Sequence, residues 1–240
     1  MPPPLFQILD HVETPIGVLY LRRRELLGRP GTVVTEVSVE HELLMSSLNT
    51  ESERALATLA LRLHSAPESR DDLEVLVGGL GLGYTARAAL ADPRVGRVEV
   101  VERVPAVIDW MVRGLLPLSN ALNADDRLAL LEGDVYAQLL GPPQRTYDLV
   151  LIDVDHSPRE PLDLASAPFY TAEGLRAARA HLRPGGVLAV WSAEPDDAFL
   201  AVLQQVFPGA RAEVVTWINE LIDDGQEVED VVFLGRREPE

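Results

Sequence analysis

The stretch "VLVGGLGLGYTARAAL" (residues 75–90) decides the fold of this chain. An apolar run leads into four glycines within six positions, and a helix-like pattern follows at once. Glycine leaves backbone amides uncovered, and a helix N-terminus favours the approach of a polar, nucleotide-like group. The stretch therefore predicts a strand, a glycine loop and a helix that together bind a nucleotide-like ligand.

Two ligand classes fit this loop. Residues 79–83 read G-x-G-x-G, the pattern of S-adenosylmethionine-type folds. Residues 81–86 also satisfy the G-x-G-x-x-G/A pattern of dinucleotide-binding folds. The loop alone leaves both open, and with them a nicotinamide oxidoreductase.

Alternating apolar strands and amphipathic helices continue from Leu73 onward, which predicts a doubly wound α/β fold with a seven-stranded, mainly parallel sheet. No helix separates the last two strands, so we expect an antiparallel pair at one edge. The predicted strands are 73–78, 97–102, 127–132, 147–153, 186–192, 211–218 and 229–237, and the predicted helices are 84–91, 105–114, 135–140, 171–182 and 196–206.

The first 48 residues predict a small β-hairpin domain, with strands at 16–22 and 32–40 and a third short strand at 43–45. A helix begins at Asn49 or Thr50, because Thr50 and Glu53 have the spacing of a capping box. A polar linker follows at residues 65–72. The expected domains are thus 1–48, a linking helix and linker at 49–72, and a nucleotide-binding α/β domain at 73–240.

Composition restricts the function. The chain has no cysteine, which excludes a disulfide framework, a thiolate metal site and a cysteine nucleophile. Its 38 acidic and 21 basic residues give a net charge of −17, so we expect no binding to nucleic acid or to anionic membranes. It lacks an 18-residue apolar run and a signal-like start, which predicts a cytoplasmic protein. The acidic charge is compatible with a cationic substrate such as an amine.

Polar residues stand at two strand ends; the first, Glu102, fits both folds, and the second, at Asp134, favours the S-adenosylmethionine-type transferase fold over the dinucleotide fold. Glu102 closes the second strand of the main domain, where a carboxylate accepts hydrogen bonds from ribose hydroxyls. Gly133 and Asp134 follow the third strand, where the carboxylate would accept the adenine amino group, cap the next helix, or do both. The antiparallel terminal pair points the same way, because dinucleotide folds normally continue in parallel.

Four segments in order, at residues 75–110, 130–139, 147–158 and 169–190, resemble the spermidine synthase (polyamine aminopropyltransferase) family. The resemblance runs from about Leu73 to Ser192. It implies a class I S-adenosylmethionine-dependent transferase fold, with S-adenosylmethionine or its decarboxylated form as co-substrate. It also implies a homodimer or higher homo-oligomer formed through the N-terminal hairpin.

The resemblance implies roles for single residues. Asp153 in "LIDVDHSP" matches the first aspartate of the family's D-S-S-D-P segment, which contacts the attacking amine. A carboxylate there would orient a cationic amine and accept its proton. The implied donor-binding residues are Gly79, Gly81, Gly83, Glu102, Gly133, Asp134 and Asp153.

The chain departs from the family at the polyamine site. His156 stands in place of the segment's second aspartate, and Asp155 lies one position early. Leu82 replaces the aspartate that grips the donor's amino-bearing tail, and residues 52–54 (Ser-Glu-Arg) replace a Tyr-His-Glu segment. These changes favour methyl transfer over aminopropyl transfer.

Asp153, Asp155 and His156 are the candidate catalytic residues. The imidazole would act as a general base near neutral pH or would only hydrogen-bond the aspartates. No metal is expected, because three ligands within four positions of one loop have poor geometry. Residues 157–170 predict a lid over the acceptor site, bordered by Met45 and Tyr170.

The sequence thus predicts an S-adenosylmethionine-dependent transferase that moves a methyl group to a small nucleophilic acceptor such as an amine. The alternatives are an aminopropyltransferase that uses decarboxylated S-adenosylmethionine and a polyamine, and a non-catalytic nucleotide-binding module.

Overall fold

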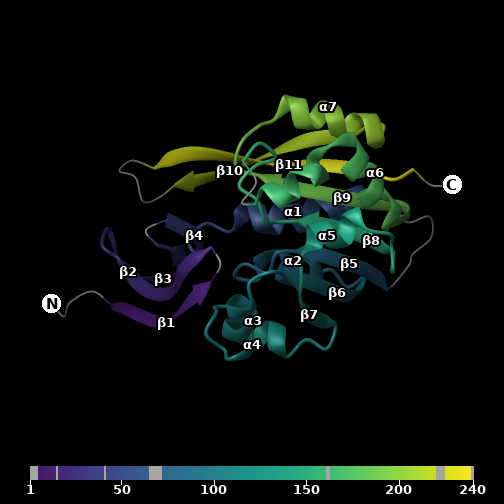
Figure 1. The fold of residues 1–240 in the computed structure, drawn as a ribbon. Coiled ribbons are helices and arrows are strands. Elements are labelled where there is room, and N and C mark those ends of the chain that lie inside the picture. Colours follow the sequence, from purple (N-terminus) through teal and green to yellow (C-terminus); the bar gives the residue numbers. More distant parts are fainter. Residues whose placement is uncertain are drawn as a thin grey trace.

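The computed structural model describes residues 5–14, 16–40, 42–64, 72–160, 163–219 and 225–238. Their strands are β1 (Phe6–Thr14), β2 (Gly17–Leu26), β3 (Arg29–Val39), β4 (Glu42–Ser46), β5 (Leu73–Gly78), β6 (Val95–Glu102), β7 (Leu128–Glu132), β8 (Tyr147–Ile152), β9 (Leu182–Ser192), β10 (Arg211–Asn219) and β11 (Gln226–Arg236). They form a four-stranded sheet, β1-β2-β3-β4, and a seven-stranded sheet, β10-β11-β9-β8-β5-β6-β7 (Figure 1).

The large sheet confirms the predicted fold class. Strands β5 to β9 pair in parallel, and β11 runs antiparallel between β9 and the edge strand β10. The central strands β5 and β8 are mostly apolar because both faces of the sheet are covered. Leu149 and Leu151 of β8 pack on one face, and Val150 and Ile152 pack on the other.

Helices cover both faces of the large sheet. They are α1 (Glu51–Leu63), α2 (Tyr84–Leu90), α3 (Pro105–Val112), α4 (Ser119–Asn123), α5 (Val135–Leu140), the 3₁₀ helix η1 (Leu164–Tyr170), α6 (Ala172–Ala180) and α7 (Asp197–Val206). Helices α1 to α4 contribute to the apolar cluster on one face, and α5 to α7 and η1 contribute to the cluster on the other. The sequence did not predict α4 or η1. Among the described residues, none of the helices has the length and hydropathy needed to span a bilayer.

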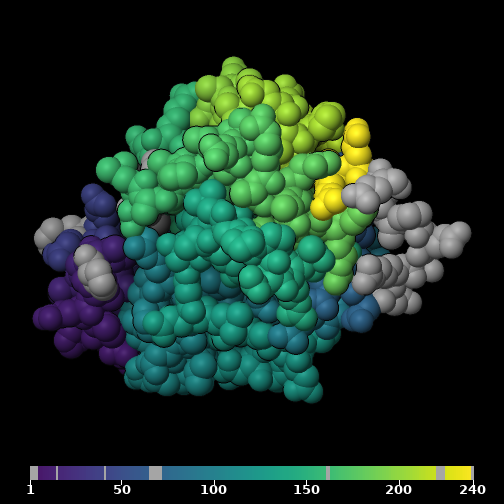
Figure 2. Space-filling view, turned by 45° about the vertical axis from the view of Figure 1, so that its right-hand side comes forward, coloured from purple at the N-terminus to yellow at the C-terminus, as the bar shows by residue number. Residues whose placement is uncertain are grey.

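The N-terminal sheet is larger than the predicted hairpin. Strands β2 and β3 pair as expected, but they continue to a two-residue turn at Leu27–Gly28, in a stretch that was predicted to separate them. Strand β1, which was not predicted, adds to the far side of β2. In Figure 2 this sheet, coloured purple, stands at one side of the main body.

The N-terminal sheet nevertheless shares its core with the rest of the molecule. Leu19, Leu21 and Val37 belong to the same apolar cluster as α1 and one face of the large sheet. The domain boundaries at residues 48 and 72 remain predictions. Residues 65–71 of the predicted linker lie outside the described residues.

The predicted capping box at the start of α1 is wrong. Thr50 is the N-cap residue, but its side chain caps no amide. Its backbone N–H instead donates to Glu51 Oε2, at 2.7 Å. Glu53 therefore does not cap the helix, and its carboxylate belongs to the candidate functional site.

Candidate functional site

The glycine loop joins β5 to α2, and its three predicted glycines all have positive φ, between 51° and 93°. A Cβ on Gly79 would lie 2.3 Å from the backbone oxygen of Asp153, and one on Gly83 would lie 2.5 Å from Leu122 Cδ1. A Cβ on Gly81 would meet no heavy atom within 4 Å. Gly79 and Gly83 thus allow the loop to pack closely on its neighbours, whereas Gly81 faces open space that a ligand can enter.

Glu102 holds this loop against the end of β6. Its side chain is buried, Oε2 accepts the Leu80 N–H at 2.8 Å, and Oε1 accepts the Val104 N–H at 2.7 Å. Burial raises the pKa of Glu102, and these backbone amides oppose the rise. Each carboxylate oxygen has more than one lone pair, so the predicted bond to a ribose hydroxyl remains compatible with these contacts.

Asp134 caps α5 at the end of the neighbouring strand, β7. Its Oδ1 accepts the N–H groups of Tyr136 and Ala137, at 2.9 and 3.1 Å. Oδ2 accepts no hydrogen bond from the described residues, so it remains available to a ligand. The Gly133 N–H donates to the backbone oxygen of Glu102, at 3.0 Å, which places Asp134 beside the end of β6. We call the glycine loop, Glu102, Gly133 and Asp134 the donor strip.

Three carboxylates gather at the end of β8, and we call Glu53, Asp153 and Asp230 the carboxylate cluster. They come from α1, from the residue after β8 and from β11. Thr85 at the start of α2 donates its hydroxyl to Asp153 Oδ2, at 2.6 Å, and to the backbone oxygen of Glu53, at 3.3 Å. The cluster therefore adjoins the glycine loop through Thr85.

Burial raises the pKa of each carboxyl in the cluster, and repulsion between the carboxylates adds to the rise at Asp153 and Glu53. Burial, with the negative charge of Asp230, raises the pKa of Asp153 to about 6. Burial and then the charges of Asp153 and Asp230 raise the pKa of Glu53 to about 8. Burial also raises the pKa of Asp230, against hydrogen bonds from Ser52 and Trp217. Groups that repel each other in this way are stabilised by a cation placed among them.

Sequence reasoning missed Glu53 and Asp230 as members of this site. The signal for Asp230 was its place in β11, where it shares a face with the buried Val232 and Leu234. A buried carboxylate on an otherwise apolar strand face needs a polar partner, and Trp217 Nε1 supplies one at 2.8 Å. The signal for Glu53 is its place in residues 52–54, which stand where the family has a Tyr-His-Glu segment, but sequence alone marks that stretch only as a departure from the family.

The other two candidate catalytic residues face different surroundings. His156 is exposed beside the cluster, and the charge of its protonated ring would lower the pKa of Asp230. The His156 and Trp191 rings pack edge to face, with their centroids 6.3 Å apart. Asp155 is buried, and its Oδ2 accepts the hydroxyls of Tyr136 and Tyr170, at 2.6 and 2.7 Å. These contacts fix η1 to α5 and give no support to a catalytic role for Asp155.

The predicted lid is anchored at several points. Arg159 pairs with Asp196, at 3.0 Å, and Asp163 pairs with Arg103, the residue after Glu102, at 2.7 Å. Tyr170 is held by Asp155 and Met45 packs against the apolar core, so neither has a contact that marks an acceptor pocket. Residues 161–162 lie outside the described residues.

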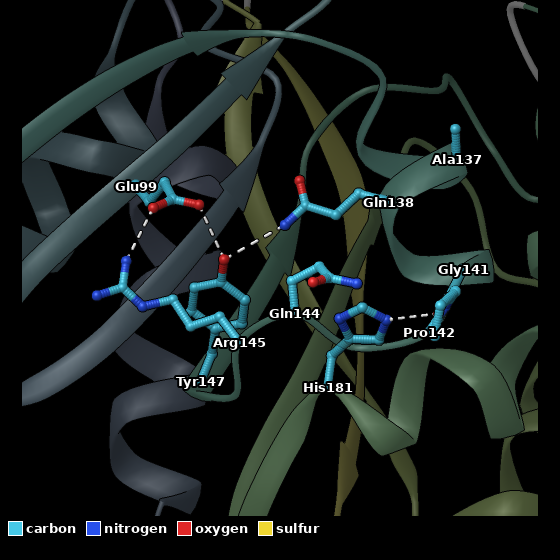
Figure 3. A pocket seen from close by; sticks show the side chains of 9 residues that line it. All are labelled: Glu99, Ala137, Gln138, Gly141, Pro142, Gln144, Arg145, Tyr147 and His181. Atoms are coloured by element: carbon cyan, nitrogen blue, oxygen red, sulfur yellow. Dashed lines mark hydrogen bonds and ion pairs between the residues drawn. The ribbon is translucent and has the colours of Figure 1, made fainter.

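A separate pocket of about 320 Å³ lies between α5 and the first residues of β8 (Figure 3). Its polar groups mostly satisfy one another: Glu99 accepts from Tyr147, at 2.8 Å, and from Arg145, at 3.1 Å. The pocket contains none of the predicted site residues. Its lining consists of Glu99, Ala137, Gln138, Gly141, Pro142, Gln144, Arg145, Tyr147 and His181.

No family model matches the chain, but curated proteins are similar to part of it. Polyamine aminopropyltransferase 2 of Streptomyces coelicolor is 36% identical over 126 residues, which are 52% of this chain and 22% of that protein. Putrescine N-methyltransferase 3 of Nicotiana tabacum is 30% identical over 151 residues, 63% of this chain and 37% of that protein. The chain thus spans well under half the length of these relatives.

Solved structures share the fold. Spermidine synthase from Thermotoga maritima matches with a TM-score of 0.70 and 16% identity, over 98% of this chain and 73% of that one. Human methyltransferase-like protein 13 in complex with SAH matches with a TM-score of 0.54 and 23% identity, over 79% of this chain and 83% of that one. The partial sequence relatives and this fold together confirm the resemblance of the chain to the spermidine synthase-like family of class I S-adenosylmethionine-dependent transferases.

Proposed function

We propose that this chain is an S-adenosylmethionine-dependent transferase that moves a methyl group to a small amine. The observation that carries the proposal is that the donor strip adjoins the carboxylate cluster at the carboxyl ends of the parallel strands. Open α/β sheets bind their ligands at this edge. The names of the partial relatives, which include putrescine N-methyltransferases and an aminopropyltransferase, support this reaction class.

The residues of the donor strip fit the donor. Gly81 leaves open space beside the loop, Glu102 would hold the ribose hydroxyls, and Asp134 Oδ2 would accept the adenine amino group. The bound donor supplies a methyl carbon made electrophilic by a positively charged sulfur. Leu82 is buried and apolar, so this loop position offers no carboxylate to a decarboxylated donor. That absence favours methyl transfer.

The carboxylate cluster would bind the acceptor as a cation and remove its proton. With a pKa of about 6, Asp153 is largely ionised at neutral pH and can accept a proton from the bound ammonium. With a pKa of about 8, Glu53 holds its own proton until a cation arrives. The neutral amine then attacks, and positioning by the cluster supplies much of the rate.

Aminopropyl transfer is the second candidate, because three carboxylates suit an acceptor with more than one positive charge. The two reactions release different products. Incubation with each donor and a panel of mono- and diamines distinguishes them: S-adenosylhomocysteine reports methyl transfer, and methylthioadenosine reports aminopropyl transfer. Formation of neither product with any amine would contradict the proposal.

The Asp153→Asn variant tests the proton acceptor. We expect kcat to fall by about 100-fold or more, since general-base catalysis contributes that much. The matched control is Asp126→Asn, because Asp126 is exposed and precedes β7. Full turnover by Asp153→Asn with normal donor binding would show that Asp153 is not the base.

We also propose that copies of the chain associate through the N-terminal sheet. Strand β1 is an edge strand, and its Phe6 and Ile8 side chains are more than half exposed, at 62% and 53%. Covering such an edge is the usual way to prevent unspecific pairing. A monomer in sedimentation at micromolar concentration would contradict this. The cytoplasmic location stays a prediction.

A further inference from the structure

Arg54 stands at the rim of the glycine loop. It lies in the first turn of α1, one residue after Glu53, and its guanidinium carbon is 5.5 Å from the ring centroid of Tyr84. Tyr84 is the first residue of α2 and directly follows Gly83. The bond from Thr85 to the Glu53 backbone fixes α1 to this same turn. The cation is therefore placed where the loop enters α2.

The charge of Arg54 is not neutralised by a neighbour. Within the described ranges its guanidinium forms no ion pair, whereas Arg94 and Arg127 are paired with aspartates at 2.7 and 2.8 Å. Its side chain is exposed, in a chain whose net charge is −17. The face of an aromatic ring holds a guanidinium without using its N–H donors, so these donors remain available to a ligand.

The two possible donors differ in one group. Both carry a sulfonium and an amino group, but only S-adenosylmethionine carries an α-carboxylate. The carboxylate cluster attracts the amino group of either donor and repels an added carboxylate. Leu82 is buried and apolar, so this loop position offers no carboxylate to the amino group of the donor and no cation to the added carboxylate of S-adenosylmethionine. Selection of the carboxylated donor then requires a cation near the cluster.

We propose that Arg54 binds the α-carboxylate of the donor and thereby selects S-adenosylmethionine over its decarboxylated form. This inference rests on the proposed function. A guanidinium pairs with a carboxylate through two parallel N–H groups, which gives both strength and orientation. Tyr84 holds the guanidinium at the loop, and Arg54 is the specificity-determining residue that commits the site to methyl transfer.

Calorimetric titration of the full chain with both donors tests this. The unmodified protein is expected to bind S-adenosylmethionine more tightly. Arg54→Gln should weaken that binding about tenfold, which corresponds to about 1.4 kcal/mol, and should change binding of the decarboxylated donor less than about twofold. Arg54→Glu should reverse the preference. The matched control is Arg62→Gln, because Arg62 is exposed in the last turn of the same helix.

Variants of Tyr84 give a second, independent readout. Tyr84→Phe keeps the ring face and should keep the preference, whereas Tyr84→Leu removes it and should lower the affinity for S-adenosylmethionine alone. If Arg54→Gln leaves the ratio of the two affinities unchanged while both donors still bind, the inference is wrong and the proposed function stands. If the unmodified protein binds neither donor, the proposed function and the inference both fail.

Discussion

The raised pKa of Glu53 makes the stability of the protein depend on pH. An ordinary glutamate releases its proton near pH 4.5, but Glu53 in the folded protein keeps it to about pH 8 because of burial and the charges of Asp153 and Asp230. Between these values the folded state binds more protons than the unfolded chain, so stability falls as the pH rises. The contribution of Glu53 is fully present below pH 4.5 and is lost as the pH rises through about 8.

The size of this effect follows from the interval between the ordinary pKa of glutamate, 4.5, and the pKa of Glu53 in the folded protein, about 8. Each pH unit is worth about 1.36 kcal/mol, which gives an upper bound of about 5 kcal/mol over the full interval. The side chain is partly exposed and shares its site with two other acids, so screening reduces the effect to about 2 kcal/mol. Glu53→Gln removes the titrating group and should remove this part of the pH dependence.

Denaturant unfolding at pH 5, 7 and 9 measures the effect. The unmodified protein should lose about 2 kcal/mol more stability across this range than Glu53→Gln does. Glu173→Gln is the matched control, because Glu173 is an exposed glutamate in the first turn of α6. Parallel stability profiles for the unmodified protein and Glu53→Gln would refute a buried, proton-holding Glu53.

Two further variants test the loop and the Asp155 contacts. Gly79→Ala puts a methyl group 2.3 Å from the Asp153 backbone oxygen at positive φ, so thermal unfolding should show a loss of more than about 2 kcal/mol and titration should show no donor binding. The control is Gly209→Ala, which also has positive φ but has open space around it and should lose only about 1 kcal/mol of stability. Equal losses of stability in the two variants would contradict the close contact at Gly79. Asp155→Ala removes the acceptor shared by the Tyr136 and Tyr170 hydroxyls; one of them can then donate to the other, but the second is left unpaired, which should cost about 2–3 kcal/mol. An unchanged melting temperature would show that the buried carboxylate does not hold η1.

Local patterns predicted the large sheet because each of its strands carries a largely apolar or alternating segment between turn residues. The strand ends at Gly78 and Glu102 agree with the prediction to the residue. The same reasoning missed β1 and α4, where the chain is short, mixed in polarity and stabilised by pairing with distant residues. It also placed β9 four residues late, because Gly185 and Gly186 read as a strand start although pairing with β8 begins at Leu182.

The candidate site also consists of a part that local sequence predicted and a part that it did not. The donor strip follows from residues at strand ends, since parallel strands bring their carboxyl ends to one edge. The carboxylate cluster joins Glu53, Asp153 and Asp230 from elements far apart in the chain, and no local pattern brings them together. Asp155 shows the remaining limit: sequence places it beside Asp153, but only the folded loop reveals that its side chain turns to Tyr136 and Tyr170.

The place of β11 between β9 and β10 has a consequence for the order in which the protein is made. Strand β10 leaves the ribosome first, yet its backbone pairs only with β11, which is the strand that joins it to the sheet. Asp230 also arrives with β11. A nascent chain therefore contains every residue of the donor strip while it still lacks a third of its carboxylate cluster; under the proposed function, the acceptor site is the last one for which synthesis supplies the residues.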